Sequence, residues 1–338
     1  MQKSVDCPTY PPQIPSDALE PTLPIVDCHH HLWHPFADRY LADAFQNDIL
    51  ASGHNVTASV YVECSVMQRT SGPAHLRTLG EAEFVSGMAA MGASGTFGPT
   101  RICEGYVGAA DLRLGAAVAE VLDAVQVASG GRLKGIRGAA NWDADVSVNS
   151  GSRPLAPRGL LLDRSFREGF QTLVHGGYVY DAWQYYPQYS ELCDLADAFP
   201  DATIVVNHCG GLLGVGAYDN AENFSKWKAG IEAMAERQNV RMKLGGLSGR
   251  RNGFGYETRR EPAKLADLVS DWRPYIETCI EYFGAHRCMF ESNYPVDRVA
   301  GNYQTIWNAF KTITTACSME DKLAMYALNA RRIYKLEN

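Results

Sequence analysis

The run Val26-Asp27-Cys28-His29-His30-His31 carries the densest set of chemically useful side chains in the sequence. It ends an expected strand, and because side chains on a strand alternate between two faces, His29 and His31 project the same way. Two imidazoles at that spacing can chelate one divalent ion such as zinc, or bind two oxygens of an anionic substrate. The alternative is a histidine-rich turn that only ends the strand. The sequence favours a catalytic or metal-binding pair over that turn.

His208 is a second candidate, because it ends the apolar run Thr203-Ile204-Val205-Val206-Asn207 and precedes Cys209-Gly210-Gly211. The two glycines allow a ligand to approach the backbone closely. A histidine in this position, taken alone, is structural as often as it is functional. Beside the first motif, it favours a shared site in which His208 polarises a substrate carbonyl or adds a third metal ligand.

Carboxylates interrupt two further apolar runs. Glu63 ends one of them, and Glu291 lies within Cys288-Met289-Phe290-Glu291-Ser292-Asn293-Tyr294-Pro295-Val296-Asp297. An acidic residue in an apolar strand is costly unless it is paired or functional. Glu291 and Asn293 share one face of the strand, so both point inward if either does. These carboxylates predict a general base.

Basic residues on the neighbouring strands leave a second interpretation open. Arg137 ends Lys134-Gly135-Ile136-Arg137 and can hold a substrate carboxylate through two hydrogen bonds. Arg137 and Lys243 are equally the expected partners if Glu63 and Glu291 form structural ion pairs instead.

An aromatic cluster follows a fifth apolar run, in Tyr180-Asp181-Ala182-Trp183-Gln184-Tyr185-Tyr186. Trp183 and Tyr186 would form a substrate-binding wall with a hydroxyl donor. Aromatic clusters belong to the core more often than to a pocket, so both interpretations stand.

Eight short apolar segments that alternate with longer helical ones are needed to position these side chains. The expected strands are Ile25–His29, Thr57–Glu63, Tyr106–Asp111, Leu133–Ala139, Tyr178–Trp183, Thr203–Asn207, Val240–Leu244 and Cys288–Ser292, with helices such as Asp38–Ser52, Ala116–Ser129, Pro187–Phe199, Phe224–Gln238 and Pro274–Phe283 between them. Eight strand–helix units imply a closed parallel (β/α)₈ barrel, whose catalytic groups lie at the carboxyl ends of the strands. The alternative, a doubly wound open sheet, usually has a glycine-rich phosphate loop after its first strand, and histidines stand there in this chain.

The chain is therefore expected to form one barrel domain over residues 25–338, preceded by a proline-rich extended arm over residues 1–24 that would suit a homodimer. The segment Ser65–Glu104, with its glycine-rich tail, is expected to be a long loop that forms either a lid or a plain surface excursion.

The composition excludes several classes of protein. The 338 residues carry a formal charge of −7 and contain no basic run, which argues against binding to nucleic acid or to anionic lipid. No run of apolar residues is long enough to span a membrane, and the first twenty residues resemble neither a signal peptide nor an anchor. Nine scattered cysteines without a C-x-x-C pair indicate a reducing, cytoplasmic location.

These motifs together resemble the metal-dependent hydrolases of the amidohydrolase superfamily, in the branch of the fuconolactonases and 2-pyrone-4,6-dicarboxylate lactonases. The likeness runs from about Ile25 to the C-terminus and includes Val62-Glu63-Cys64, Asp181-Ala182-Trp183 and Lys243-Leu244-Gly245-Gly246-Leu247. It implies a barrel that opens lactones of small carboxylate-bearing molecules, with zinc in some members and no metal in others. By that resemblance His29, His31 and His208 would ligate the metal or polarise the carbonyl, and Arg137 would bind the substrate carboxylate.

The chain departs from the family pattern where the family carries its general base. The family usually has an aspartate near the end of the eighth strand, and this chain has Asn293, which cannot take up a proton at neutral pH. Glu291, or Asp297 just beyond, is the expected replacement. Asn207, Gly138 and Tyr186 also stand where an acid or a histidine is common. A metal-free site stays open, as does a decarboxylase, isomerase or cyclase, and a non-enzymatic binder is the remaining alternative.

Overall fold

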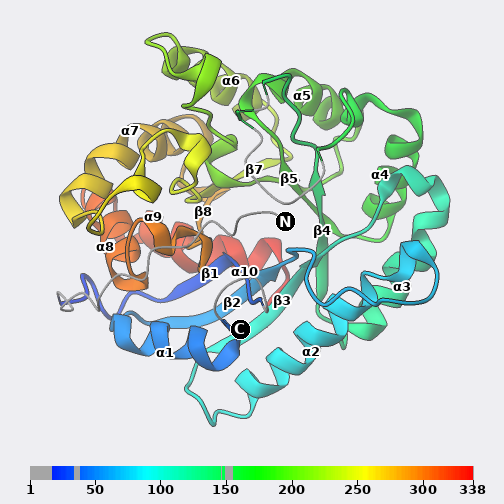
Figure 1. The fold of residues 1–338 in the computed structure, drawn as a ribbon, viewed down its shortest axis with the longest axis horizontal. Helices are drawn as coiled ribbons and strands as arrows, with labels where there is room; N and C mark the ends of the chain where they lie inside the picture. Colours follow the sequence, from blue (N-terminus) through cyan, green and yellow to red (C-terminus); the bar gives the residue numbers. More distant parts are fainter. Residues whose placement is uncertain (1–16, 34–38, 146, 149–154, 338) are drawn as a thin grey trace.

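The computed structural model describes residues 17–33, 39–145, 147–148 and 155–337, which fold around one ring of strands (Figure 1). The eight strands are all parallel and follow one another in chain order, which confirms the expected (β/α)₈ barrel. Their bounds are β1 Ile25–His30, β2 Val56–Val62, β3 Arg101–Gly108, β4 Leu133–Ala139, β5 Val179–Trp183, β6 Ile204–Val206, β7 Val240–Leu244 and β8 Cys288–Phe290. The predicted strands match these to within a few residues.

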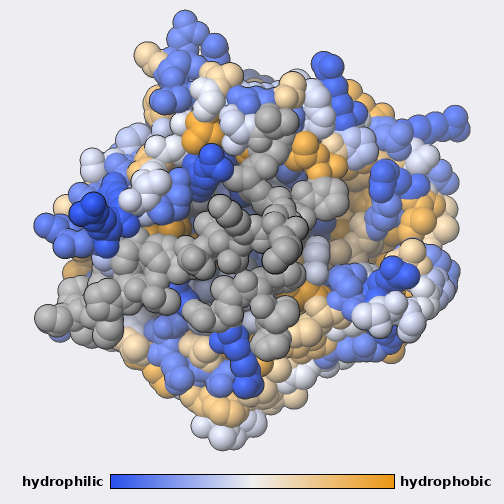
Figure 2. All heavy atoms as spheres, viewed as in Figure 1, coloured by the Kyte–Doolittle hydropathy of each residue, from blue (hydrophilic) through white to orange (hydrophobic). Residues whose placement is uncertain are grey.

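The helices surround the ring, except for α10, which lies across its amino-terminal end (Figure 1). They are α1 Ala42–Ser52, α2 Leu79–Ala93, α3 Val118–Ala128, α4 Arg164–His175, α5 Tyr189–Ala198, α6 Asn223–Ala235, α7 Leu265–Phe283, α8 Tyr303–Ile313, α9 Met319–Leu323 and α10 Asn329–Ile333. On the face drawn in Figure 2, hydrophilic side chains predominate around the edge and hydrophobic ones stand between them. None of the helices in the described ranges has the length and apolar character needed to cross a membrane.

The ring closes between β8 and β1 through a buried aspartate. Asp27 Oδ1 accepts hydrogen bonds from the backbone N–H of Ser292 at 3.0 Å and of His29 at 3.3 Å. Its Oδ2 accepts from the hydroxyls of Ser292 at 2.5 Å and Tyr303 at 2.9 Å. Beyond it, Asn293 N–H donates to the carbonyl of His29 at 2.9 Å. Asp27 therefore joins the first and last strands where the site residues leave them.

The C-terminal segment closes the amino-terminal end of the barrel. Ala330, Ile333 and Tyr334 pack against the valines that point into the ring, among them Val60 and Val205. Arg331 beside them donates to Thr57, at the start of β2. A ligand therefore reaches the interior from the carboxyl ends of the strands.

Two expectations about connections differ from the structure. Ser65–Glu104 is not a long loop, because it contains α2 and the first residues of β3. Glycine in α2 allows the helix to pack closely against that strand. Pro274 does not begin a helix either, since it lies inside α7. The longer connections follow β4, β6 and β7 at the mouth of the barrel, and part of the first of these lies outside the described residues.

Most of the predicted N-terminal arm, residues 1–16, lies outside the described residues. The described remainder is held on α8: Leu19 N–H donates to Asn308 Oδ1 at 2.9 Å, and Lys311 Nζ donates to the carbonyls of Leu19 and Glu20 at 2.9 Å.

Candidate active site

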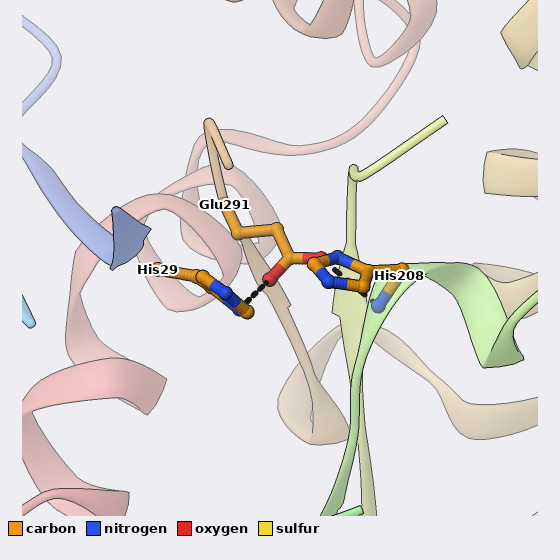
Figure 3. Close-up of side chains that lie close together, drawn as sticks. All are labelled: His29, His208 and Glu291. Atoms are coloured by element: carbon orange, nitrogen blue, oxygen red, sulfur yellow. Dashed lines mark hydrogen bonds and ion pairs between the residues drawn. The ribbon is translucent and has the colours of Figure 1, made fainter. Parts of the chain in front are cut away.

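The predicted site residues come together at the carboxyl ends of the strands. His29 and His31 leave β1, Arg137 leaves β4, His208 follows β6 and Glu291 follows β8. Figure 3 shows His29 and His208 on either side of Glu291, with the carboxylate facing both rings.

His29 and His31 face one another through their outer ring nitrogens, with 3.2 Å between the two Nε2 atoms. His31 Nδ1 lies 2.7 Å from the Val62 carbonyl, which only accepts hydrogen bonds, so this nitrogen carries the ring proton. Arg137 Nη1 lies 3.3 Å from His29 Nε2 and only donates, so His29 Nε2 presents a lone pair. Two lone pairs at 3.2 Å repel one another unless a proton or a metal ion lies between them.

His29 is uncharged under ordinary conditions. Burial lowers the pKa of its imidazole well below the usual value, and the positive charges of Lys243 and Arg137 act in the same direction. Burial also lowers the pKa of His208, against the opposing pull of Glu291. Neutral imidazole is the form that ligates metal ions.

Glu291 is fully buried, and its carboxylate contacts both histidines. Its Oε1 accepts from the His208 backbone N–H at 2.9 Å and from His208 Nδ1 at 2.7 Å. Its Oε2 lies 2.7 Å from His29 Nδ1. Burial acts to raise the pKa of Glu291, but the pull of His208 and Lys243 and the hydrogen bonds outweigh it, so the pKa lies below its usual value. Glu291 is thus a buried carboxylate ion.

Two glycines after β7 make room for this arrangement. A Cβ atom on Gly246, whose φ is +64°, would lie 2.0 Å from His208 Nδ1. A Cβ on Gly245 would lie 2.3 Å from the Glu291 carbonyl oxygen. Any larger residue would displace the histidine or the glutamate, so the motif after the seventh strand has a steric role in the site.

The comparisons with known proteins identify the family of the chain. Residues 26–336 match the family model Amidohydro_2, described as amidohydrolase. The chain belongs to the amidohydrolase family.

This amidohydrolase has relatives of similar length. It is 30% identical over 333 residues to an uncharacterised protein, y4mH, of Sinorhizobium fredii, an alignment that covers 93% of this chain and 99% of the relative. It is 25% identical over 216 residues to an L-fucono-1,5-lactonase of Burkholderia multivorans, covering 61% of this chain and 64% of the lactonase.

Solved structures share the fold of the amidohydrolase. A zinc-bound amidohydrolase of Burkholderia multivorans superposes with a TM-score of 0.70 at 23% identity, covering 93% of this chain and 99% of that one. A 5-carboxyvanillate decarboxylase of Sphingomonas paucimobilis superposes with a TM-score of 0.54 at 13% identity, covering 93% of this chain and 100% of that one. The shared fold therefore accommodates both hydrolysis and decarboxylation.

The donor set of this amidohydrolase fits a divalent metal ion. One ligand atom from each of His29, His208 and Glu291 lies within 4.8 Å of the others. The contacts of Glu291 with the two Nδ1 atoms, at 2.7 Å, are shorter than the roughly 3.3 Å between neighbouring ligands of tetrahedral zinc. The facing Nε2 atoms of His29 and His31, at 3.2 Å, do match that spacing.

The other predicted site residues are held by partners inside the protein. Arg137 Nε donates to Glu63 Oε1 at 2.7 Å, and its Nη2 donates to the Glu63 carbonyl. Only Nη1 of Arg137 therefore faces the site. Lys243 Nζ donates to Asp181 Oδ2 at 2.7 Å, with both side chains fully buried beneath His29.

Asn293 and Asp297 bind each other. Asn293 Nδ2 donates to Asp297 Oδ1 at 2.8 Å. Burial raises the pKa of Asp297 from the ordinary 3.8 to about 8, the nearby charge of Glu291 adds to this, and hydrogen bonds from Asn293 and Ser248 oppose it. Asp297 therefore holds a proton at neutral pH.

Tyr186, another predicted site residue, forms a hydrogen bond inside the protein. Its hydroxyl donates to Asn223 Oδ1 at 2.7 Å.

Sequence reasoning missed Arg251, in the connection that follows β7. Its guanidinium lies 5.1 Å from the ring centre of Trp183, and Arg137 lies 5.7 Å from the same ring. Its Nε is buried, and within the described ranges it has neither a hydrogen-bond partner nor an ion-pair partner. The available signal was the pair Arg250-Arg251 directly after Gly249, in a connection at the mouth of the barrel. An unpaired guanidinium beside a neutral histidine cluster can bind an anionic group.

Proposed function

We propose that this amidohydrolase opens a lactone or a related ester of a small, carboxylate-bearing substrate at the carboxyl-terminal mouth of the barrel. The observation that carries the proposal is the pair of facing Nε2 lone pairs of His29 and His31, with His208 beside them. The distant likeness to the L-fucono-1,5-lactonase and the zinc bound to the structural neighbour support the same chemistry.

In this proposal His29 and His31 hold a divalent ion, zinc by preference, through Nε2. Such an ion polarises a carbonyl oxygen and lowers the pKa of bound water to about 7. His208 takes up the proton of the attacking water at its Nε2, because its Nδ1–H is bound to Glu291. Asn293 cannot accept this proton, and Asp297 already holds one at neutral pH.

The substrate carboxylate is bound by Arg251, with Arg137 Nη1 beside it. Arg137 alone cannot form the two-point contact that its sequence position suggested, because Glu63 occupies its other two nitrogens. The Trp183 ring lies within 5.7 Å of both guanidinium groups and forms one wall of the binding site.

A panel of lactones, each with and without a free carboxylate, tests the proposal through the proton released on ring opening. We expect turnover of carboxylate-bearing members by the wild-type chain and none by His31→Ala. His75→Ala is the matched control. His75 is exposed in a short turn of helix outside the candidate site, so its replacement should leave turnover unchanged. Near-normal turnover by His31→Ala would refute the assignment.

One observation favours a second candidate, a non-hydrolytic decarboxylase, isomerase or cyclase. No carboxylate of the described site is left to activate water directly: Glu291 is bound by two histidines, Glu63 by Arg137, and Asp297 is protonated. Reaction in ¹⁸O-labelled water separates the two candidates. Hydrolysis places one ¹⁸O atom in the new carboxylate, whereas decarboxylation releases CO₂ and isomerisation releases nothing, with no solvent oxygen in the organic product.

A further inference from the structure

Glu291 occupies an unusual place in this site, behind the imidazoles and away from the nitrogens that face one another. Its two oxygens lie 2.7 Å from His208 Nδ1 and 2.7 Å from His29 Nδ1, from the ends of three different strands. The side chain is fully buried, and the glycines after β7 leave room for it because they carry no Cβ atom. Its position is therefore defined by packing as well as by charge.

The contacts of the two histidines fix where their ring protons lie. A carboxylate oxygen only accepts, so His208 Nδ1, hydrogen-bonded to Oε1 at 2.7 Å, carries a hydrogen. For His29 the Arg137 guanidinium donates to Nε2 at 3.3 Å, which leaves the hydrogen of the neutral ring on Nδ1. That nitrogen lies 2.7 Å from Glu291 Oε2, and the Lys243 ammonium is farther away, at 3.5 Å. His31 also carries its ring hydrogen on Nδ1, because that nitrogen lies 2.7 Å from the Val62 carbonyl oxygen, which only accepts. Three histidines from two strand ends thus share one tautomer.

We infer that Glu291 is a positioning carboxylate: by holding Nδ1–H of both His29 and His208, it keeps the Nε2 of His29 as a neutral donor for a divalent cation and the Nε2 of His208 as a neutral proton acceptor beside it. It orients both rings at once, and it supplies negative charge close to the cation without binding it. Carboxylates that hold a histidine in this way typically account for 10–100-fold in metal affinity. This chain therefore meets the lack of an eighth-strand aspartate with a carboxylate two residues earlier that acts through the histidines.

The buried cations next to the site explain why such a charge is needed. Arg137 Nη1 lies 3.3 Å from His29 Nε2, and Lys243 Nζ lies 3.5 Å from His29 Nδ1. Each of these cations has its own carboxylate partner, Glu63 and Asp181. A divalent ion would add two further charges, and Glu291 is the carboxylate placed between the histidines to offset them.

The test compares wild type, Glu291→Gln and the matched control Asp297→Asn, which changes a second buried carboxyl whose described hydrogen bonds are with Asn293 and Ser248. Two readouts are needed. Long-range ¹⁵N–¹H correlation spectra of the metal-free chain with labelled histidine report the tautomer of each ring, and zinc titration against a chromophoric chelator reports metal affinity. Thermal unfolding of each variant confirms that it is folded, and Glu291→Asp provides a second substitution that keeps the charge but shortens its reach.

We expect the wild-type spectrum to show His29 and His208 with Nδ1–H. In Glu291→Gln, whose amide can accept from only one ring, at least one of the two should change to Nε2–H. Zinc affinity should then fall by about 10–100-fold, while Asp297→Asn stays within about threefold of wild type. Glu291→Asp should give an intermediate loss.

Two results would overturn the inference. Unchanged tautomers and unchanged zinc affinity in Glu291→Gln would show that the carboxylate does not position the rings. Unchanged tautomers with zinc binding abolished would make Glu291 a direct ligand. The consequence for metal binding rests on the proposed function, but the tautomers are measured on the metal-free chain. A wild-type chain that binds no zinc would therefore contradict the proposed function, and the spectra would still decide whether Glu291 positions the rings.

Discussion

The buried pair Lys243–Asp181 beneath the histidines gives the sharpest prediction about stability. The two charged atoms are 2.7 Å apart and neither side chain has any exposed surface. Although burial acts to lower the pKa of Lys243, the negative charge of Asp181 raises it above its usual value, so the lysine is charged. Asn207 Nδ2 and the Tyr334 hydroxyl also donate to Asp181, at 3.0 and 2.8 Å.

Lys243→Met removes the cation that pairs with Asp181 and leaves the carboxylate in the barrel interior with two neutral donors. Breaking a buried pair from one side costs about 3–5 kcal/mol. At roughly 2.1 cal/mol/K per residue, the 338 residues have an unfolding entropy of about 0.7 kcal/mol/K, so the loss corresponds to a fall in Tm of about 4–7 °C. Urea denaturation measures the loss of unfolding free energy, and calorimetry independently measures the fall in Tm.

Two controls isolate the buried charge. Lys228→Met breaks an exposed pair with Glu281, whose atoms are 3.9 Å apart, and should cost less than about 1 kcal/mol. The double variant Asp181→Asn/Lys243→Met leaves no unpaired charge and should recover at least half of the loss, because a buried pair contributes little net stability. If Lys243→Met were as stable as Lys228→Met, the reasoning about the buried pair would be refuted.

Three further predictions concern the site. Gly246→Ala, whose Cβ would lie 2.0 Å from His208 Nδ1, should displace His208 and lower both zinc affinity and turnover, whereas Gly87→Ala, with open space around its Cβ, should change neither. Because the pKa of Asp297 is about 8 in the folded chain against an ordinary 3.8, the folded chain keeps a proton that the unfolded chain releases; stability should therefore fall as pH rises from about 4 to about 8, and urea midpoints should show a smaller fall in Asp297→Asn. Arg251→Met should weaken binding of a carboxylate-bearing lactone about 10–100-fold, the loss of one charge-assisted contact of about 1.5–3 kcal/mol, while the exposed neighbour Arg250→Met leaves the KM unchanged.

The barrel could be predicted from the sequence because each of its signals is local. Apolar strand segments such as Leu133–Ala139 and Val240–Leu244 have the bounds expected from their residues alone. The helix α2 escaped notice because Gly80, Gly87 and Gly92 interrupt its pattern. Its tight packing, where a Cβ on Gly80 would lie 2.1 Å from the Met67 carbonyl, explains why small residues stand there.

The sequence predicts that the candidate residues lie at one end of the barrel, but it does not predict how they pair. Alternation along β1 gives His29 and His31 a common direction, and strand ends meet at one side of the barrel. Which carboxylate meets which base depends on closure of the ring, which brings β8 beside β1 and places Glu291 between His29 and His208. The pairing of Arg137 with Glu63 likewise crosses from β4 to β2, and Arg251 comes from a connection without a recognisable motif.

The claim that the histidine cluster is a metal centre is tested most directly by metal content, measured by inductively coupled plasma mass spectrometry on protein purified without added metal or nickel affinity. The account predicts close to one divalent ion, zinc by preference, per wild-type chain and a small fraction of that in the double variant His29→Asn/His31→Asn. Equal metal content in the two proteins, or a folded wild-type chain that carries no metal and takes up none when zinc is supplied, would contradict it.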